Sequence, residues 1–134
     1  MIFDKNKSIE QLENDFWDEP NFFSGLVTQC HKLRRIPISE LTSGNLRLLI
    51  GQQIGLQYTI PLALECLNIY PFDDGDRFEG ALLQNVLRIN VDFWVNHKDL
   101  YCELLSVMNK LNPTDEVYQE HILPYWQKLN IKNP

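Results

Sequence analysis

The sequence has few of the features that mark an enzyme, a metalloprotein or a disulfide-stabilised domain. Its cysteines, Cys30, Cys66 and Cys102, are odd in number and lack the close pairing of metal sites, so we expect small buried thiols in a reducing compartment. The three histidines stand alone, without a second candidate ligand three or four residues away. No glycine-rich phosphate loop with a following Lys-Ser/Thr is present. We therefore expect no catalytic residue set, no metal and no cofactor.

Positive charge is also scarce. The chain has 12 Lys and Arg against 18 Asp and Glu, which gives a net charge of −6. A nucleic-acid-binding domain needs a basic face to displace counterions, so we expect no direct nucleic-acid binding. The acidic balance suits solubility and would also suit a basic protein partner. Because no secretory signal and no uninterrupted apolar run of about 20 residues occurs, we expect a cytoplasmic protein without a membrane span.

What the sequence does contain is helical periodicity. No stretch alternates with period two convincingly, whereas apolar residues recur at three- and four-residue spacing along most of the chain. At 134 residues and 44% hydrophobic content the chain suits one globular core. The sequence therefore predicts an all-α fold, a single-domain helical bundle over residues 1–134.

The most apolar stretch, residues 46–67, is expected to form the centre of this bundle. Two sets of residues have the spacing of one helix face: Leu46, Leu49 and Ile50 in the first half, and Ile60, Ala63, Leu64 and Leu67 in the second. We expect these two helices to form a buried antiparallel helical hairpin.

Local signals predict the details of this hairpin. Gly55 should end the first helix, because glycine adopts the left-handed conformation at low cost. Thr59 should cap the second helix, and Pro61 in its first turn would forfeit no helical hydrogen bond. If the turn lies near residue 56, Arg47 and Glu65 are equally far from it and could form an ion pair; an exposed Glu65 is the alternative.

Capping residues delimit other helices. Ser8 and Gln11 have the pattern of a capping box ahead of a short helix. Asp74 or Asp76 should cap the helix that follows the loop at residues 71–76. Asn112-Pro113 should begin the last helix, with the proline in its favoured first position.

Two groups of acidic residues are candidate binding sites. Glu13, Asp15, Asp18 and Glu19 surround Trp17, which either packs on the core as a lid or anchors a partner surface. Asp73, Asp74, Asp76 and Glu79 surround Phe72, either as a helix-capping loop or as a partner-binding loop. The spacing of the second group does not fit an EF-hand, because the glycine and the final glutamate are out of register.

Several motifs between residues 9 and 105 carry a family resemblance. They are Trp17 with Pro20, Cys30-His31-Lys32-Leu33-Arg34, Leu49-Ile50-Gly51-Gln52-Gln53-Ile54-Gly55-Leu56, Pro61-Leu62-Ala63-Leu64-Glu65, residues 75–83 and Phe93-Trp94. In these motifs the sequence resembles the helical CdiI immunity proteins of bacterial contact-dependent growth inhibition systems. The predicted C-terminal helix, within residues 110–134, shows no such resemblance.

The resemblance implies a cytoplasmic, non-enzymatic protein that binds and neutralises the toxic C-terminal domain of a cognate CdiA. Such toxins are commonly nucleases, which are often basic around the active site and would suit an acidic inhibitor. The matched motifs, which include Asp76 and Glu79, are expected to be scaffold. The remaining acidic and aromatic candidates for toxin binding are Glu13, Asp15, Trp17, Asp18, Glu19, Asp73 and Asp74. A small helical ligand-binding or regulatory domain that reuses the fold remains the alternative.

Overall fold

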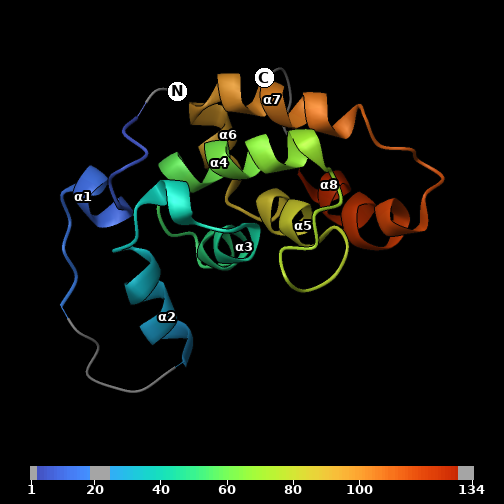
Figure 1. Cartoon of the computed structure of the whole chain (residues 1–134). Coiled ribbons are helices and arrows are strands. Elements are labelled where there is room, and N and C mark those ends of the chain that lie inside the picture. The colour runs from blue at the N-terminus through green and yellow to red at the C-terminus, as the bar shows by residue number, and fades with distance from the viewer. Residues whose placement is uncertain (1–2, 19–24, 130–134) are drawn as a thin grey trace.

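The all-α prediction is confirmed. The computed structural model describes residues 3–18 and 25–129. In these ranges it has the α-helices α1 (Ile9–Glu13), α2 (Gly25–Leu33), α3 (Ser43–Gly51), α4 (Leu56–Ile69), α5 (Ala81–Leu87), α6 (Val91–Asn96), α7 (Lys98–Met108) and α8 (Leu123–Lys128), with a 3-10 turn η1 (Ile38–Glu40) and a π-helical segment η2 (Tyr118–Ile122) (Figure 1). No strand forms there, although Ser8 and Pro37 make an isolated β-bridge. None of the described helices is long and apolar enough to cross a membrane.

Helix α4 lies at the centre of the fold. It has α7 on one side and α3 and α5 on the other, while α8 and η2 pack against α5 (Figure 1). The side chains predicted to form the core, Leu49, Ile50, Leu64 and Leu67, are all buried. The central position of residues 46–67 is therefore confirmed, because both of its helices contribute fully buried faces to one continuous core.

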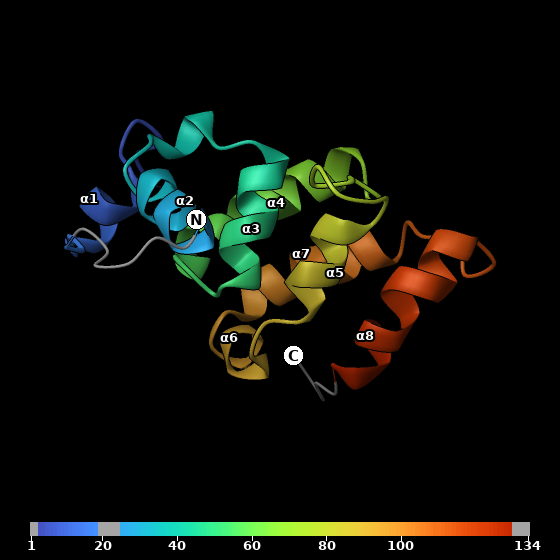
Figure 2. The same ribbon diagram turned by 90° about the horizontal axis from the view of Figure 1, so that it is seen from below.

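The two helices pack against each other as predicted, but the predicted antiparallel direction is wrong. Helices α3 and α4 pack closely, but Figure 1 views α3 along its axis and α4 from the side. Turned by 90°, Figure 2 shows α3 lengthwise, so the two helices cross steeply. The short connection contains two left-handed residues, Gln53 with φ 56° and Gly55 with φ 60°. These residues redirect the chain sharply between the two helices.

The start of α4 also differs from the prediction. Gly55 does not end the first helix, which stops at Gly51; it is instead the N-cap of α4, which begins at Leu56. Thr59 is therefore not a cap: it is buried, and its Oγ1 donates a hydrogen bond to the carbonyl of Ile54 (3.4 Å). Pro61 lies inside the helix and not in its first turn. The prediction placed the start of α4 too late because Thr59 is a typical capping residue, whereas Gly55 caps the helix without a side chain that could be recognised in the sequence.

The predicted pair of Arg47 and Glu65 does not form. Arg47 Nε donates to the carbonyl of Gly75 (2.7 Å), and Glu65 lies beside Lys5, with 3.4 Å between Nζ and Oε1. The steep crossing of α3 and α4 removes the facing geometry on which the pairing depended.

Two predicted helix starts are corrected as well. Gly80, with φ 89°, precedes α5, so neither Asp74 nor Asp76 caps that helix. Near the C-terminus Asn112 accepts from the Thr114 amide, and the helical segment starts only after Asp115, which accepts from the Val117 amide (2.8 Å). By contrast, the capping box of Ser8 and Gln11 is present as predicted, and Thr42 and Asn45 form another at α3.

Pro124 is associated with the π-helical segment η2. It follows that segment directly and lies in the first turn of α8. Proline has no amide hydrogen to donate to the fourth residue before it, and a wider helical turn relieves the clash of its ring with that residue. The proline is therefore accommodated by a π-helical turn directly before it.

Candidate functional site

The first acidic group lies on α1 and on the extended segment after it. Arg34, just beyond the end of α2, fastens this segment to the protein. Its side chain is only 1% exposed, and its Nη2 donates to Glu13 Oε1 (3.0 Å) and to the carbonyl of Asp15 (2.7 Å). A buried guanidinium needs such partners, because an unpaired buried charge is strongly destabilising. Glu13 therefore has a structural partner within the chain.

Trp17 covers this buried arginine. The guanidinium carbon of Arg34 lies 3.8 Å from the centroid of the indole, and the His31 ring meets the indole edge-on at 5.3 Å. The indole Nε1 donates to Asp15 Oδ2 (3.3 Å). Trp17 nevertheless remains 36% exposed. Trp17 thus packs against Arg34 and still presents a face to solvent, while its role as an anchor for a partner stays a prediction.

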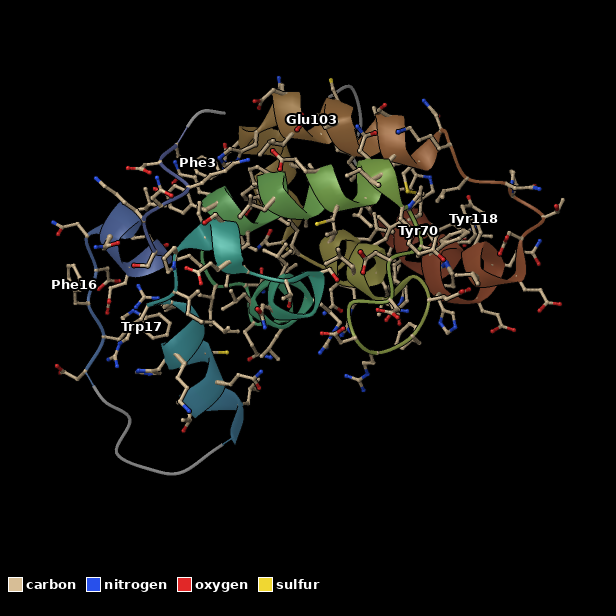
Figure 3. The ribbon with its side chains drawn as sticks, viewed as in Figure 1. Phe3, Phe16, Trp17, Tyr70, Glu103 and Tyr118 are labelled. Carbon is tan, nitrogen blue, oxygen red and sulfur yellow. The ribbon has the colours of Figure 1, made fainter. Side chains whose placement is uncertain are left out.

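The residues around Trp17 form an exposed strip of chain, residues 15–18, which we call the acidic strip. Phe16 is 61% exposed, and Figure 3 shows it pointing away from the protein while Trp17 lies toward α2. Asp15 and Asp18 are exposed on either side of these rings. Glu19, the remaining member of the predicted group, lies outside the described residues. The strip therefore presents two carboxylates and two aromatic rings on one short segment.

The start of α4 contacts α1, the helix that precedes the strip. Tyr58, in the first turn of α4, donates from its hydroxyl to the carbonyl of Leu12 in α1 (3.3 Å). Phe3 packs edge-on against the same tyrosine ring at 5.3 Å. The first acidic group is thus held at the N-terminal end of the central helix.

The second acidic group occupies the loop between α4 and α5. Asp73 Oδ1 accepts from the Gly75 amide (2.9 Å), and Asp74 Oδ1 accepts from the Asp76 amide (2.8 Å). These bonds shape the tight turn in which Gly75 and Asp76 are both left-handed. Arg47 fixes the turn to α3 through the Gly75 carbonyl. Asp73 and Asp74 therefore have a role within the loop, while Asp74 remains exposed.

Two apolar residues that sequence reasoning missed adjoin this loop. Ile69 is 88% exposed and Tyr70 is 51% exposed, at the C-terminal end of α4 (Figure 3). Ile69 continues the helix face of Leu62 and Cys66, which is buried only where α4 has neighbours. The sequence offered one indication of their exposure: the residues from Pro71 onward have the composition of a loop, so this apolar pair lies at the end of a helix. Exposed large apolar side chains next to carboxylates are typical of protein-binding surfaces.

The structure does not bring the two acidic groups together. In both views α3 lies between helix α1 and the loop between α4 and α5 (Figures 1 and 2). Figure 3 likewise places Trp17 and Tyr70 well apart. They are two separate surfaces, and the end-to-end course of α4 connects them.

The expectation of three buried thiols is confirmed only for Cys30, because Cys66 is partly buried and Cys102 is exposed. Burial raises the pKa of the Cys30 thiol, so that this group stays protonated at neutral pH beside His31. Burial raises the pKa of Cys66 too, and the charges of Asp73 and Glu65 raise it further. A thiol with a raised pKa is a poor nucleophile, because the thiolate is the reactive form. Among the described residues no group of three or more His, Cys, Asp or Glu side chains is placed to hold a metal ion.

Comparison with known proteins identifies a family. No curated protein and no solved structure matches the chain. A family model described as CDI immunity proteins matches residues 11–104, which is more than half of the chain. The match contains the strip at residues 15–18, the whole of α4 and the loop at residues 70–80, and it ends before η2 and α8. The chain therefore belongs to the family of CDI immunity proteins.

Proposed function

We propose that this protein binds the toxic C-terminal domain of a cognate CdiA in the cytoplasm and neutralises it without catalysing a reaction. Membership of the CDI immunity family supports this function. The proposed toxin is a nuclease with a basic active-site cleft. The observation that carries the proposal is the acidic strip, where exposed carboxylates flank exposed aromatic rings on a segment fastened by a buried arginine.

The chemistry of the strip suits a basic cleft. Asp15 and Asp18 are exposed and can approach cationic side chains, which speeds association and sets the orientation of the two proteins. Phe16 and Trp17 supply apolar area, and large aromatic residues dominate the energy of many interfaces. Arg34 holds the backbone at Asp15, so little ordering entropy is lost when a partner binds.

The second surface supports the same function. Ile69 and Tyr70 form an apolar centre, and Asp73 and Asp74 follow them on the loop. This arrangement repeats the combination of apolar anchor and carboxylates that the acidic strip has. In the first acidic group, Glu13 contributes to toxin binding only indirectly, because its carboxylate pairs with Arg34.

The test measures binding of the toxin domain encoded by the adjacent upstream gene. The variant Asp15→Asn/Trp17→Ala/Asp18→Asn should weaken binding at least tenfold, about 1.4 kcal/mol, and should reduce its salt dependence. The variant Ile69→Ser/Asp73→Asn/Asp74→Asn tests the second surface in the same way. Glu40→Gln/Glu103→Gln is the matched control, because it removes two exposed carboxylates on η1 and α7, outside both surfaces.

The outcomes separate the parts of the proposal. If the wild-type protein neither binds the toxin domain nor blocks its nuclease activity, the function is wrong for this toxin. If it binds but neither surface variant differs from the control, the function stands and the proposed surfaces are wrong. Thermal unfolding of each variant shows whether a loss of binding reflects a loss of fold.

A further inference from the structure

A basic groove lies between α3 and α5 of this acidic protein. Its volume is about 470 Å3, and its polar lining is Arg47, Gln52, Gln53, Arg77, Asn85 and Arg88. A smaller hollow of about 130 Å3 shares the three arginines, so they surround one continuous depression. Among the residues that the structure describes, no aspartate or glutamate lines either space. We call this depression the arginine groove.

The positive charge in the groove is not neutralised from within the described chain. None of its three arginines makes an ion pair with a described carboxylate. Arg47 uses Nε to hold the Gly75 carbonyl, and Arg88 lies 5.6 Å from the centroid of the Tyr125 ring. Three like charges around one depression repel one another, and that repulsion is relieved when an anion binds.

The arginines of the groove suit planar anions. Arginine presents a fork of donors that matches a carboxylate bidentately. Asn85 is fixed beside the arginines, because its Nδ2 donates to the Arg47 carbonyl (2.9 Å). Gly51 lies so close to Asn85 that a Cβ there would fall 2.9 Å from Nδ2. The absence of a side chain at Gly51 therefore allows the amide to approach α3.

The groove adjoins the surface proposed to bind the toxin. An apolar hollow of about 120 Å3 beneath Trp17 is lined by Leu26 and Gln52, among others, and the same two residues line the arginine groove. A partner that covers Trp17 is therefore next to the groove. The order along this face is a strip of exposed carboxylates, an apolar hollow and then three arginines.

We propose that the arginine groove receives carboxylate side chains of an acidic segment of the toxin domain. This inference rests on the proposed function and adds a second, oppositely charged contact to it. Nucleic acid is the less suitable occupant, because a protein of net charge −6 repels an extended polyanion while a few carboxylates fit one local groove. Adjacent surfaces of opposite sign fix the orientation of a partner, because a rotated partner meets like charges.

Arg77 and Arg88 are the residues to test, since both are exposed and neither holds the backbone through a side-chain hydrogen bond among the described residues. With the upstream-encoded toxin domain as the probe, Arg77→Gln/Arg88→Gln should raise Kd at least tenfold. The reversal Arg77→Glu/Arg88→Glu should raise Kd at least a hundredfold, because it places carboxylates against carboxylates. Lys7→Gln/Lys98→Gln removes the same number of positive charges elsewhere and should change Kd less than threefold.

Unchanged binding by the glutamine variant, or tighter binding by the reversal, would overturn the inference. In either case wild-type binding still supports the proposed function, whereas a wild-type protein that does not bind the toxin domain defeats both. Binding of a single-stranded RNA by the immunity protein alone, lost in Arg77→Gln/Arg88→Gln, would assign the groove to nucleic acid instead. Thermal unfolding confirms that each variant keeps its fold.

Discussion

Arg34 and Glu13, 21 residues apart in the chain, form an ion pair of 3.0 Å in which the arginine is almost fully buried and the glutamate still reaches solvent. The pair joins the end of α1 to the residue that follows α2. Because Arg34 also bonds the Asp15 carbonyl, this guanidinium helps to fix the position of the acidic strip. The strip is therefore positioned by a long-range contact, although its residues are adjacent in sequence.

Glu13→Gln should lower the free energy of unfolding by about 1–3 kcal/mol, because it removes the anion from a buried guanidinium. Glu10→Gln is the matched control. Glu10 pairs with Arg35 at 3.7 Å, and Arg35 is exposed, so its loss should cost less than about 1 kcal/mol. Urea denaturation measures both variants. Equal losses would show that Arg34 does not depend on Glu13.

Leu64→Ala should lower the free energy of unfolding by about 2–5 kcal/mol, since it opens a cavity between α4 and its neighbours. Ile69→Ala on the same helix is the control: that side chain is exposed, and its truncation should change stability by less than about 0.5 kcal/mol. Urea unfolding curves give both values. A loss below 1 kcal/mol for Leu64→Ala would remove α4 from the centre of the core.

Gly75→Ala should destabilise the loop between α4 and α5 by about 1–3 kcal/mol. Gly75 has φ 52°, a region that residues with a side chain rarely adopt, and a Cβ would fall 3.0 Å from Arg47 Cδ. Gly25→Ala is the comparison, because a Cβ there meets nothing within 4 Å. Thermal unfolding compares the two variants. If Gly75→Ala were as stable as Gly25→Ala, the predicted backbone strain at residue 75 would be contradicted.

Stability should fall at alkaline pH. Burial raises the folded-state pKa of Cys30 above the ordinary 9.0, and burial with the charges of Asp73 and Glu65 does the same for Cys66. The unfolded chain therefore loses these protons first, so stability is fully present below pH 9 and declines as pH rises through the folded values. Urea unfolding from pH 7 to 10 measures the decline, and Cys30→Ala should reduce its slope. A Cys30→Ala profile with the wild-type slope would show that this thiol does not contribute.

Exposure gives a related prediction for thiol reactivity. Cys102 is exposed, whereas Cys30 is buried and Cys66 is partly buried. A thiol reagent added to the native protein at pH 8 should therefore label Cys102 first. Peptide mapping identifies the labelled residue. Labelling of Cys30 at the rate of Cys102 would show that α2 opens readily from the body of the protein.

Local sequence signals predicted the helices and the core better than they predicted helix directions. The spacing of Leu49, Leu64 and Leu67 identifies buried faces, because a helix must turn its apolar side inward. The steep crossing of α3 and α4 depends on the left-handed backbone of Gln53 and Gly55. Nothing about a glutamine side chain predicts a left-handed backbone. The crossing angle of α3 and α4 is set by the packing of the two helices as a whole.

The candidate surfaces were predictable only as residue types. The sequence shows Trp17 and the acidic residues around it. The contact between Trp17 and Arg34 could not be predicted, because it joins positions that are distant in the sequence. The arginine groove was hidden for the same reason: Arg47, Arg77 and Arg88 lie on three separate segments, and only packing gathers them. Net charge hides such a local excess, because it sums over the whole surface.

Helix α4 sets the distance between the two proposed binding surfaces. Its 14 residues span about 21 Å at 1.5 Å per residue. One end contacts α1, the helix that precedes the acidic strip, through Tyr58, and the other ends in the exposed Ile69 and Tyr70. A toxin domain that carries two complementary patches at this separation gains avidity, because its second contact forms at high effective concentration once the first has formed. A toxin with the same two patches at another separation can use only one of them, so the length of α4 discriminates between toxins.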